Sequence, residues 1–417
     1  MARLLKLGSA MLAGCFLVAA ALAPVERADQ ALGRGAYLEA VDILRAAAFP
    51  ASGAPDADAR AAWLQTHPFI GGTFDPAALG EPYTGPISPE VSDRFSRAEV
   101  RDAIREIVAR AARTNIVIIN EAHTMPRDRA FALEVARALR PLGYNILAAE
   151  TFANHPGRDG TPLDERLARD GYARLDTGYF TLDPVFGDFV RQALAMGYRP
   201  VAYESTNHRP DLPMHEQIAA REQEQAENLV ERIFRGNAHA KVLIHVGYHH
   251  VLEAPFDGGD GRAEEWMAAR LKRLTGIDPL TIEQTLFNET VPTMVAHRNL
   301  LAPRMGRRPV VLYLDGRPLV EAFPPGSVDL QVIHPPLRLV RGRPDWLWRI
   351  GRRPVRVPRA LLPGAGRRLI QAFRASEAAD AVPLDQIVVE AGRPPPPVLV
   401  PRRTRIRWAY QDPLPTG

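Results

Sequence analysis

Residues 116–150 read IVIINEAHTMPRDRAFALEVARALRPLGYNILAAE, and this stretch decides the fold class. Its two apolar runs, at residues 116–119 and 146–149, are short and bounded by polar residues, which favours buried strands of a parallel sheet. Residues 127–140 between them carry apolar side chains on one helical face, and Gly143 follows as a helix stop. The stretch therefore predicts a strand, a helix and a second strand parallel to the first.

The same alternation continues to about residue 290. Further apolar runs of strand length lie at residues 201–203, 242–246 and 280–282. Helical patterns, each followed by a glycine, lie at residues 185–196, 216–234 and 264–274. Strands that alternate with helices predict an α/β fold over residues 101–290, with a mainly parallel sheet flanked by helices.

The segments on either side of this core have a different character. Residues 29–100 predict a leader with one helix, at 36–48, and then a segment rich in Pro and Gly. Residues 300–417 are rich in Arg, hold 19 of the 38 prolines and predict a β-rich appendage. A hairpin around Asp315-Gly316 is expected to open it. The short strands expected in the appendage are 310–314, 319–323, 332–333, 337–340, 346–350, 355–357, 387–389 and 406–408.

The charge of the chain is unevenly distributed along its length. The net charge is +4, but residues 301–417 hold 20 Arg and 9 acidic residues, or +11, and the first 300 residues carry 32 basic and 39 acidic residues, or −7. A basic half can indicate nucleic-acid binding. These arginines, however, are scattered among apolar residues and prolines, and no recognised binding motif accompanies them. We therefore expect no nucleic-acid partner.

Residues 1–28 have the pattern of an export signal. Arg3 and Lys6 precede an uncharged, mostly apolar stretch at residues 7–23, and Ala19-Ala20-Ala21 provides a cleavage site of small residues. Residues 12–15 also match a bacterial lipobox, in which Cys15 would carry a lipid; alternatively, Cys15 is an apolar member of the signal. We expect an exported protein, located in the periplasm or cell envelope or secreted, whose membrane contact is limited to the signal segment or a lipid on Cys15.

Cys15 is the single cysteine, so we expect the mature chain to contain neither a disulfide nor a cysteine nucleophile. The sequence also contains no Gly-x-Ser-x-Gly elbow, which argues against a serine nucleophile of that type. It contains no His-Glu-x-x-His zinc motif either.

Acidic and imidazole side chains occur at the end of each predicted core strand. A single Glu at such a place is usually a helix cap, and a single His is usually structural. The carboxyl ends of parallel strands meet at one edge of a sheet, however, so these residues are expected to converge. Carboxylates that meet imidazoles shift each other's pKa values and can activate water or bind metal. The residues concerned are Glu121, His123, Glu150, Glu204, His245, His249 and His250.

Three segments resemble one known superfamily. Residues 120–123 (NEAH) followed by Glu150, the helix segment 220–228 with Arg221, and residues 241–251 (KVLIHVGYHHV) are similar to motifs of the erythromycin esterase-like, ChaN and TraB/Tiki superfamily. Asn120 stands where that family has glycine. The resemblance covers about residues 101–287 and implies an α/β scaffold. Its members include esterases, proposed metalloproteases and haem-iron-binding lipoproteins.

The first hypothesis for the function is a hydrolase of the esterase or metal-dependent protease type, acting on a small molecule or a peptide. Glu121, His123, Glu150, Glu204, His249 and His250 are its candidate catalytic residues, which would activate water directly or through a divalent metal. The candidate substrate-binding residues are His245 and Arg221, the latter as an oxyanion or anion ligand. Arg221 could instead form a salt bridge to a neighbouring Glu.

Two other hypotheses remain open from the sequence. One is a haem- or iron-binding envelope protein of ChaN type, for which His245, Tyr248, His249 and His250 are candidate ligands. The other is a structural or interaction module in which the site has decayed.

Overall fold

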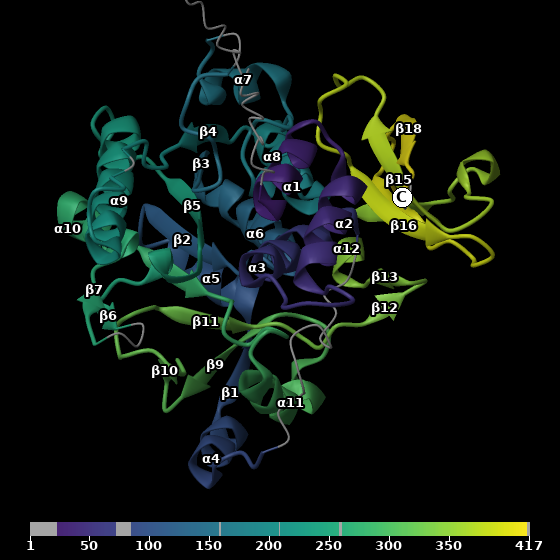
Figure 1. Cartoon of the computed structure of the whole chain (residues 1–417). Coiled ribbons are helices and arrows are strands. Elements are labelled where there is room, and N and C mark those ends of the chain that lie inside the picture. Colours follow the sequence, from purple (N-terminus) through teal and green to yellow (C-terminus); the bar gives the residue numbers. More distant parts are fainter. Residues whose placement is uncertain (1–22, 72–84, 158–159, 208, 258–260, 415–417) are drawn as a thin grey trace, which may run out of the picture.

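The computed structural model describes residues 23–71, 85–157, 160–207, 209–257 and 261–414. A nine-stranded sheet forms the middle layer of the molecule (Figure 1). Its strands are β1 (Glu99–Asp102), β2 (Ile116–Glu121), β3 (Ile146–Ala149), β4 (Arg199–Ala202), β5 (Val242–Gly247), β8 (Leu280–Glu283), β9 (Val310–Leu314), β10 (Arg317–Pro318) and β11 (Leu330–Ile333).

The strand order is β1-β9-β11-β8-β2-β5-β3-β4, and β10 pairs with β9. From β11 to β4 every neighbouring pair is parallel, whereas β1, β9 and β10 are joined by antiparallel pairing at one edge. The predicted α/β class with a mainly parallel sheet is confirmed. The sheet also extends past residue 290, because β11 pairs in parallel with β8 and β9 pairs with β11.

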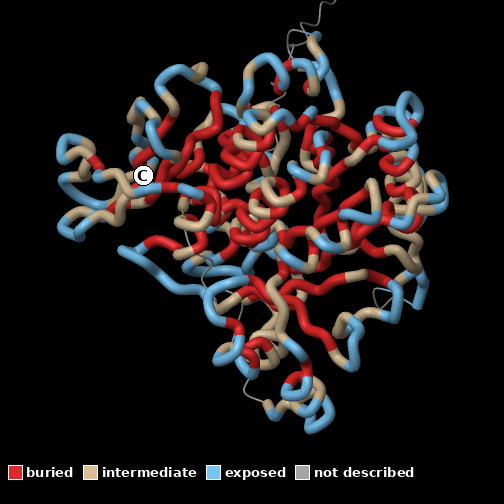
Figure 2. The backbone as a smooth tube through the Cα atoms, turned by 180° about the vertical axis from the view of Figure 1, so that it is seen from behind, coloured by how far each residue is buried: buried red, intermediate tan, exposed pale blue. Residues whose placement is uncertain are grey.

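Helices cover both faces of this sheet. Val117 and Ile119 point to one face, and Ile116 and Ile118 to the other, because side chains alternate along a strand. The first face is covered by α5 (Ala103–Ala111), α6 (Pro126–Leu139) and α8 (Pro184–Ala195). The second is covered by α9 (Met214–Leu229) and α10 (Met267–Thr275). Figure 2 shows the buried residues concentrated in the centre of these layers.

The N-terminal leader is more helical than expected. The predicted helix is α2 (Tyr37–Ala48), but α1 (Pro24–Gly33), α3 (Ala57–Thr66) and α4 (Pro89–Arg97) are present as well. Leu32, Leu38 and Leu44 are fully buried in the core cluster on the α6/α8 face, so the leader completes that core. The expectation of one helix was wrong because α3 has little apolar periodicity and α4 is mostly polar.

The predicted signal segment lies mostly outside the described residues, which begin at Ala23. The start of α1 at Pro24 falls inside the predicted segment, residues 1–28. Cleavage after Ala21 would leave α1 intact, whereas cleavage after Ala28 would divide it.

The C-terminal part forms small antiparallel sheets, as the predicted β-rich appendage requires. Residues 346–350 were expected as a strand but contain the helix α12, because Trp346, Leu347 and Ile350 are spaced to enter the core from one helical face. The predicted hairpin turn at Asp315-Gly316 is confirmed, but its second strand is β10, residues 317–318, rather than residues 319–323. The elements of this part are β12 (Leu339–Val340), β13 (Arg343–Pro344), α12 (Trp346–Arg349), β14 (Arg352–Val355), β15 (Arg367–Arg374), β16 (Asp385–Glu390), β17 (Val398–Pro401) and β18 (Ile406–Gln411).

The remaining elements are short or lie in connections. They include two strands, β6 (Phe256–Asp257) and β7 (Ala263–Glu264), and two helices, α7 (Leu163–Asp170) and α11 (Pro292–Met305). One π-helical turn is present, η5 (Val230–Phe234). The 3-10 helices are η1 (His67–Ile70), η3 (Arg140–Leu142), η4 (Phe180–Leu182), η6 (Tyr248–Val251) and η7 (Arg359–Leu361). Within the described residues, no helix is long and apolar enough to span a membrane.

The two ends of the described chain lie side by side. Figure 1 shows α1 and α2 next to the C-terminal strands. The Leu38 amide donates to Oε1 of Gln411 at 3.0 Å, and Nε2 of Gln411 donates to the Gly35 carbonyl at 2.7 Å. The last strand, β18, is thus hydrogen-bonded to the start of α2.

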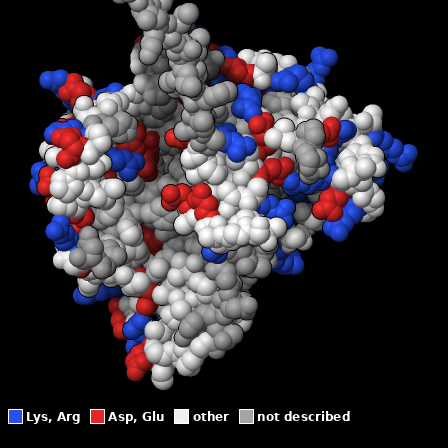
Figure 3. All heavy atoms as spheres, in the orientation of Figure 1, with Lys and Arg blue, Asp and Glu red and all other residues white. Residues whose placement is uncertain are grey.

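Acidic and basic side chains are mixed on the face drawn in Figure 3. Basic side chains are most frequent towards the right of that view, where Figure 1 shows the C-terminal strands, but acidic side chains lie among them. The local mixture of signs agrees with the scattered arginines of the sequence.

Buried ion pairs attach the C-terminal strands to the core. Arg352 of β14 donates from Nε to Oδ2 of Asp188 in α8 at 3.1 Å, and neither side chain is exposed. Nη2 of Arg352 also donates to the Pro184 carbonyl at 3.0 Å. A buried guanidinium that loses its carboxylate keeps its desolvation cost without compensation.

We predict that Asp188→Ala lowers the free energy of unfolding by about 3 kcal/mol, because it leaves the buried Arg352 with only the more distant carboxylate of Asp385, 3.9 Å from its Nη1. The measurement is urea denaturation followed by circular dichroism. The matched control is Asp93→Ala, which removes the exposed Asp93–Arg97 pair and should cost less than about 1 kcal/mol. Equal losses in the two variants would contradict the prediction.

Candidate functional site

The last residue of β2, Glu121, is buried on the α6/α8 face of the sheet, where an arginine balances the charge of its carboxylate. It lies two positions after Ile119 and therefore points to the same face. Arg129 of α6 donates to both of its oxygens, from Nε at 2.6 Å and from Nη2 at 3.0 Å. Nη1 of Arg129 donates to Oδ2 of Asp183 at 2.9 Å. Burial alone would raise the pKa of Glu121, but Arg129 and His123 outweigh it and lower the pKa to about 2.

The imidazole of His123 is fixed by this carboxylate. Nδ1 of His123 lies 3.0 Å from Oε1 of Glu121, and the ring stacks on Phe180 with centroids 3.9 Å apart. Nη2 of Arg129 donates to the His123 carbonyl at 2.9 Å. Since the ionised Glu121 can only accept, the proton lies on Nδ1 and the lone pair on Nε2. His123 is therefore oriented as a base.

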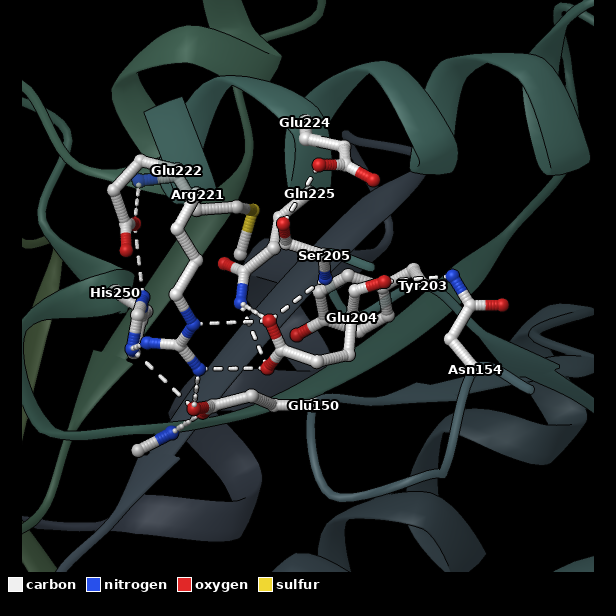
Figure 4. A network of polar contacts seen from close by, with 12 residues as sticks. Glu150, Asn154, Tyr203, Glu204, Ser205, Arg221, Glu222, Glu224, Gln225 and His250 are labelled. Carbon is white, nitrogen blue, oxygen red and sulfur yellow. Dashed lines mark hydrogen bonds and ion pairs between the residues drawn. The ribbon is translucent and has the colours of Figure 1, made fainter. Parts of the chain in front are cut away.

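A second network occupies the α9 side of the sheet edge (Figure 4). Glu150 follows β3, and Glu204 follows β4. Arg221 of α9 lies between them, with Nη2 at 2.7 Å from Oε1 of Glu150 and 2.6 Å from Oε2 of Glu204. Gln225, one turn further along α9, donates from Nε2 to both oxygens of Glu204, at 2.9 and 3.0 Å. The salt bridge foreseen for Arg221 is thus present, and 39% of its side chain remains exposed.

His250 completes this second network. Its Nδ1 lies 2.8 Å from Oε2 of Glu222, and its Nε2 lies 3.4 Å from Oε1 of Glu150 and 3.2 Å from Nη1 of Arg221. Burial alone would lower the pKa of His250, but the carboxylates of Glu150 and Glu222 raise it to about 10. The pKa of Glu150 is held well below its usual value, because His250 and Arg221 outweigh the effect of its burial.

The two networks meet at Gly247, the last residue of β5. Its amide donates to Oε2 of Glu150 at 2.6 Å. A Cβ at this position would lie 2.5 Å from Cε1 and 2.8 Å from Nε2 of His123, and 3.2 Å from Oε2 of Glu150. The absence of a side chain at Gly247 therefore allows the basic nitrogen of His123 to lie beside the Glu150 carboxylate.

Asn120 holds the connection that follows Gly247. Its Nδ2 donates to the Tyr248 carbonyl at 2.9 Å, and its Oδ1 accepts from the Gln284 amide at 2.9 Å. Tyr248 has a φ of 37°, a conformation that is uncommon for a residue with a side chain. Asn120, at the position where the resembled family has glycine, thus fixes this turn beside the site.

The other two predicted histidines lie apart from the junction. His249 points into an aromatic group formed by Phe256, Trp266 and Phe323, and burial lowers its pKa. Of the two adjacent candidate catalytic residues, only His250 faces the carboxylates, so the prediction that places His249 among the catalytic residues is wrong.

His245 lies in the core behind Glu121. Its ring packs against Phe186 and Phe189, and its Nε2 is 3.7 Å from Oε2 of Glu121. Burial lowers its pKa to about 4, although Glu121 acts in the opposite direction. At 2% exposure, His245 supports the site from within rather than lining it. His245, His249 and His250 thus lie in three different environments and do not converge on one ligand position.

Sequence reasoning missed the residues that hold the site together. Arg129 and Asp183 were not singled out, although residues 126–129 (PRDR) place three charges in the first turn of a helix beside a strand end. Gln225 was missed too, although it lies four residues after Arg221. Gly247 had no distinguishing signal, because its role depends on a close approach between strands.

The described residues contain no cluster of three or more His, Cys, Asp or Glu side chains arranged to hold a metal ion. The chemistry of the donors agrees with this. Glu121 is bound by Arg129, and Glu150 and Glu204 are bound by Arg221, so arginines occupy the carboxylate oxygens that a metal would need. The residues as placed do not fit the divalent metal considered from the sequence.

No family model and no curated protein matches the chain. A structure described as bacterial protein toxins aligns with a TM-score of 0.33 and 17% identity, covering 60% of this chain and 56% of that one. The MARTX toxin effector domain RRSP from Vibrio vulnificus gives 0.33 and 17%, over 60% and 54%. The type III effector HopBA1 gives 0.31 and 16%, over 48% and 89%. The chain thus spans just over half the length of the first two, and TM-scores this low carry no functional argument.

Folding should shift the pKa values of the two buried histidines in opposite directions, upward for His250 and downward for His245. By NMR of the imidazole rings, we expect His250 to stay protonated at pH 8, since its pKa is about 10, and His245 to stay neutral at pH 5.5, since its pKa is about 4. Because folding raises the pKa of His250 above its value of 6.5 in an unfolded chain, its protonation stabilises the fold fully below pH 6.5, and this stabilisation is lost as the pH rises to about 10.

The variant Glu222→Gln should lower the pKa of His250, because it removes one of the two carboxylates that face the ring. His245, whose pKa is set by burial, Glu121 and Arg129 rather than by Glu222 or His250, is the internal reference. An unchanged titration of His250 in this variant would refute the assignment of its protonation to Glu222.

Proposed function

We propose that the protein is a hydrolase in which His123, oriented by Glu121, activates water for attack on an ester or peptide carbonyl. The observation that carries the proposal is the pairing of Nδ1 of His123 with an ionised, buried carboxylate at 3.0 Å. Nε2 of His123 and Oε2 of Glu150 both border the space in front of Gly247, and Arg221 donates to the other oxygen of Glu150 at 2.7 Å. A base and a cation at one strand edge are the two elements that hydrolysis of a carbonyl compound needs.

The proposed steps use these side chains in sequence. Nε2 of His123 takes a proton from water, and the resulting hydroxide adds to the carbonyl carbon. The negative charge that develops on the carbonyl oxygen is stabilised by Arg221, whose guanidinium is held in place by Glu150 and Glu204. The protonated His123 then returns its proton to the leaving oxygen or nitrogen as the bond to the carbonyl carbon breaks.

Phe180 and Glu121 limit how His123 can move during these steps. The stacked ring of Phe180 covers one face of the imidazole, and Glu121 stabilises the imidazolium that forms. Because Glu121 is itself held ionised by Arg129, it does not compete for the proton.

We also propose that the chain belongs to the erythromycin esterase-like, ChaN and TraB/Tiki superfamily. Glu121, His123, Glu150 and Arg221 lie in the segments that carry the resemblance, and their side chains gather around one junction of the structure. Export through the signal segment at residues 1–28 is proposed on the sequence pattern alone.

His123→Ala should reduce turnover of a responsive substrate by about 10²–10⁴-fold, because it removes the base. The measurement is a screen of fluorogenic esters and peptides, followed by kinetics on the best substrate. The control is His249→Gln, which should retain activity because His249 lies in the aromatic group away from the junction. Full activity in His123→Ala would refute the proposal.

Gly247→Ala should also abolish activity while preserving the fold. The φ of Gly247 is −87°, which alanine adopts without strain, so the added methyl group acts on His123 rather than on the backbone. Combined with His123→Ala, the change should add no further loss of rate, since the displaced ring is already absent. Additive losses in the double variant would show that Gly247 acts on another group.

A further inference from the structure

A cavity lies beside the starts of α6 and α8, on the α6/α8 side of the sheet. It has a volume of about 410 Å³, within the usual range for small-molecule sites. Its walls come from η1, the starts of α6 and α8, α11 and the segment around α12. The apolar residues that line it include Phe69, Val185, Leu337, Trp346 and Leu347.

Two buried arginines at one end of this cavity have unused donors. Arg127 of α6 and Arg298 of α11 are 5% and 4% exposed. Both donate to the same oxygen, Oε1 of Glu289, from Nη1 of each at 3.1 and 2.8 Å. Nε and Nη2 of Arg127 and Nε of Arg298 have no hydrogen-bond partner among the described residues. Buried donors without a partner cost free energy, so their retention points to a ligand.

Near Arg127 and Arg298, two arginines face one carboxylate. Two arginines share Glu289, whose pKa they lower to about 2 in spite of its burial. The other charged residues that line the cavity are Asp183, Arg343 and Asp385. Asp183 is bound by Arg129, which lies outside the lining and also pairs with Glu121, and Arg343 pairs with Asp385. The Asp128 carboxyl lies 3.8 Å from Nε of Arg127, but burial raises its pKa to about 8, which leaves it mostly protonated at neutral pH.

The start of α6 adds a favourable field at the same end. Its N-cap is Met125, which provides no side-chain hydrogen bond, and Pro126 is its first residue. Met125, Pro126 and Arg127 all line the cavity. The positive end of the helix dipole therefore lies beside the cavity wall that Arg127 contributes.

We propose that this cavity binds an apolar monocarboxylate, with the carboxylate on Arg127 and Arg298 and the apolar body along Phe69, Val185 and Trp346. Two arginines that share one carboxylate provide a place for a second carboxylate, and guanidinium donors match its planar geometry. The apolar walls favour a hydrocarbon or aromatic body rather than a free inorganic anion. This site uses none of the residues proposed for hydrolysis.

Isothermal titration calorimetry of the purified protein with octanoate tests the proposal. Octan-1-ol has the same chain without the charge, and acetate has the charge without the chain. We expect octanoate to bind about 10–100-fold more tightly than octan-1-ol, as charge-assisted hydrogen bonds require, and acetate to show no binding. Equal binding of octanoate and octan-1-ol, or no binding of octanoate, would overturn the proposal.

Two variants separate the charged end from the apolar body. Arg298→Met leaves Arg127 to neutralise Glu289 and should weaken octanoate about tenfold while leaving octan-1-ol unchanged. Leu337→Trp changes a partly exposed lining residue, so it should preserve the fold and weaken both ligands by filling the cavity. Unchanged octanoate affinity in either variant would place the binding elsewhere and overturn the assignment. Thermal unfolding of each variant verifies that it is folded.

Discussion

Arg129 has no exposed surface, and its charge is balanced by Glu121 at the end of β2 and Asp183 at the start of α8. A guanidinium in such a place is stable only when its carboxylates are present, and each carboxylate is stable as an anion only when Arg129 is present. The ion pairs therefore fix the end of the central strand and the starts of α6 and α8 relative to one another. The carbonyl of His123 is held by the same guanidinium, so the geometry of the proposed base depends on this compensation.

The second network follows the same rule with a different arginine. Arg221 neutralises two carboxylates that follow adjacent strands, and Glu222, the next residue of α9, holds His250 from the opposite side. Adjacent residues of one helix thus serve two parts of the network. Glycine at the end of β5 lets the two networks approach each other, so the junction depends on a missing side chain as much as on the charged ones.

The sequence contained enough information for the sheet core and for most of the candidate site residues. Short apolar runs and helical periodicity located β2, β3, β4, β5 and β8, because hydrophobic burial imposes those patterns directly. The carboxyl ends of these strands then located Glu121, Glu150 and Glu204. Arg129 and Gly247 could not be found in this way, since their roles depend on contacts between elements distant in the chain. The strands β15 and β17 were missed because arginines and prolines border their apolar residues and obscure the pattern.

The contact between α2 and β18 has a consequence for the order in which the chain can fold. Leu38 and Gln411 are 373 positions apart, so this contact can form only when nearly the whole chain is available. During synthesis, the contact between α2 and β18 forms only after the last strand has been made, so it forms late. A chain built in this way remains incompletely folded until its last strand has been made.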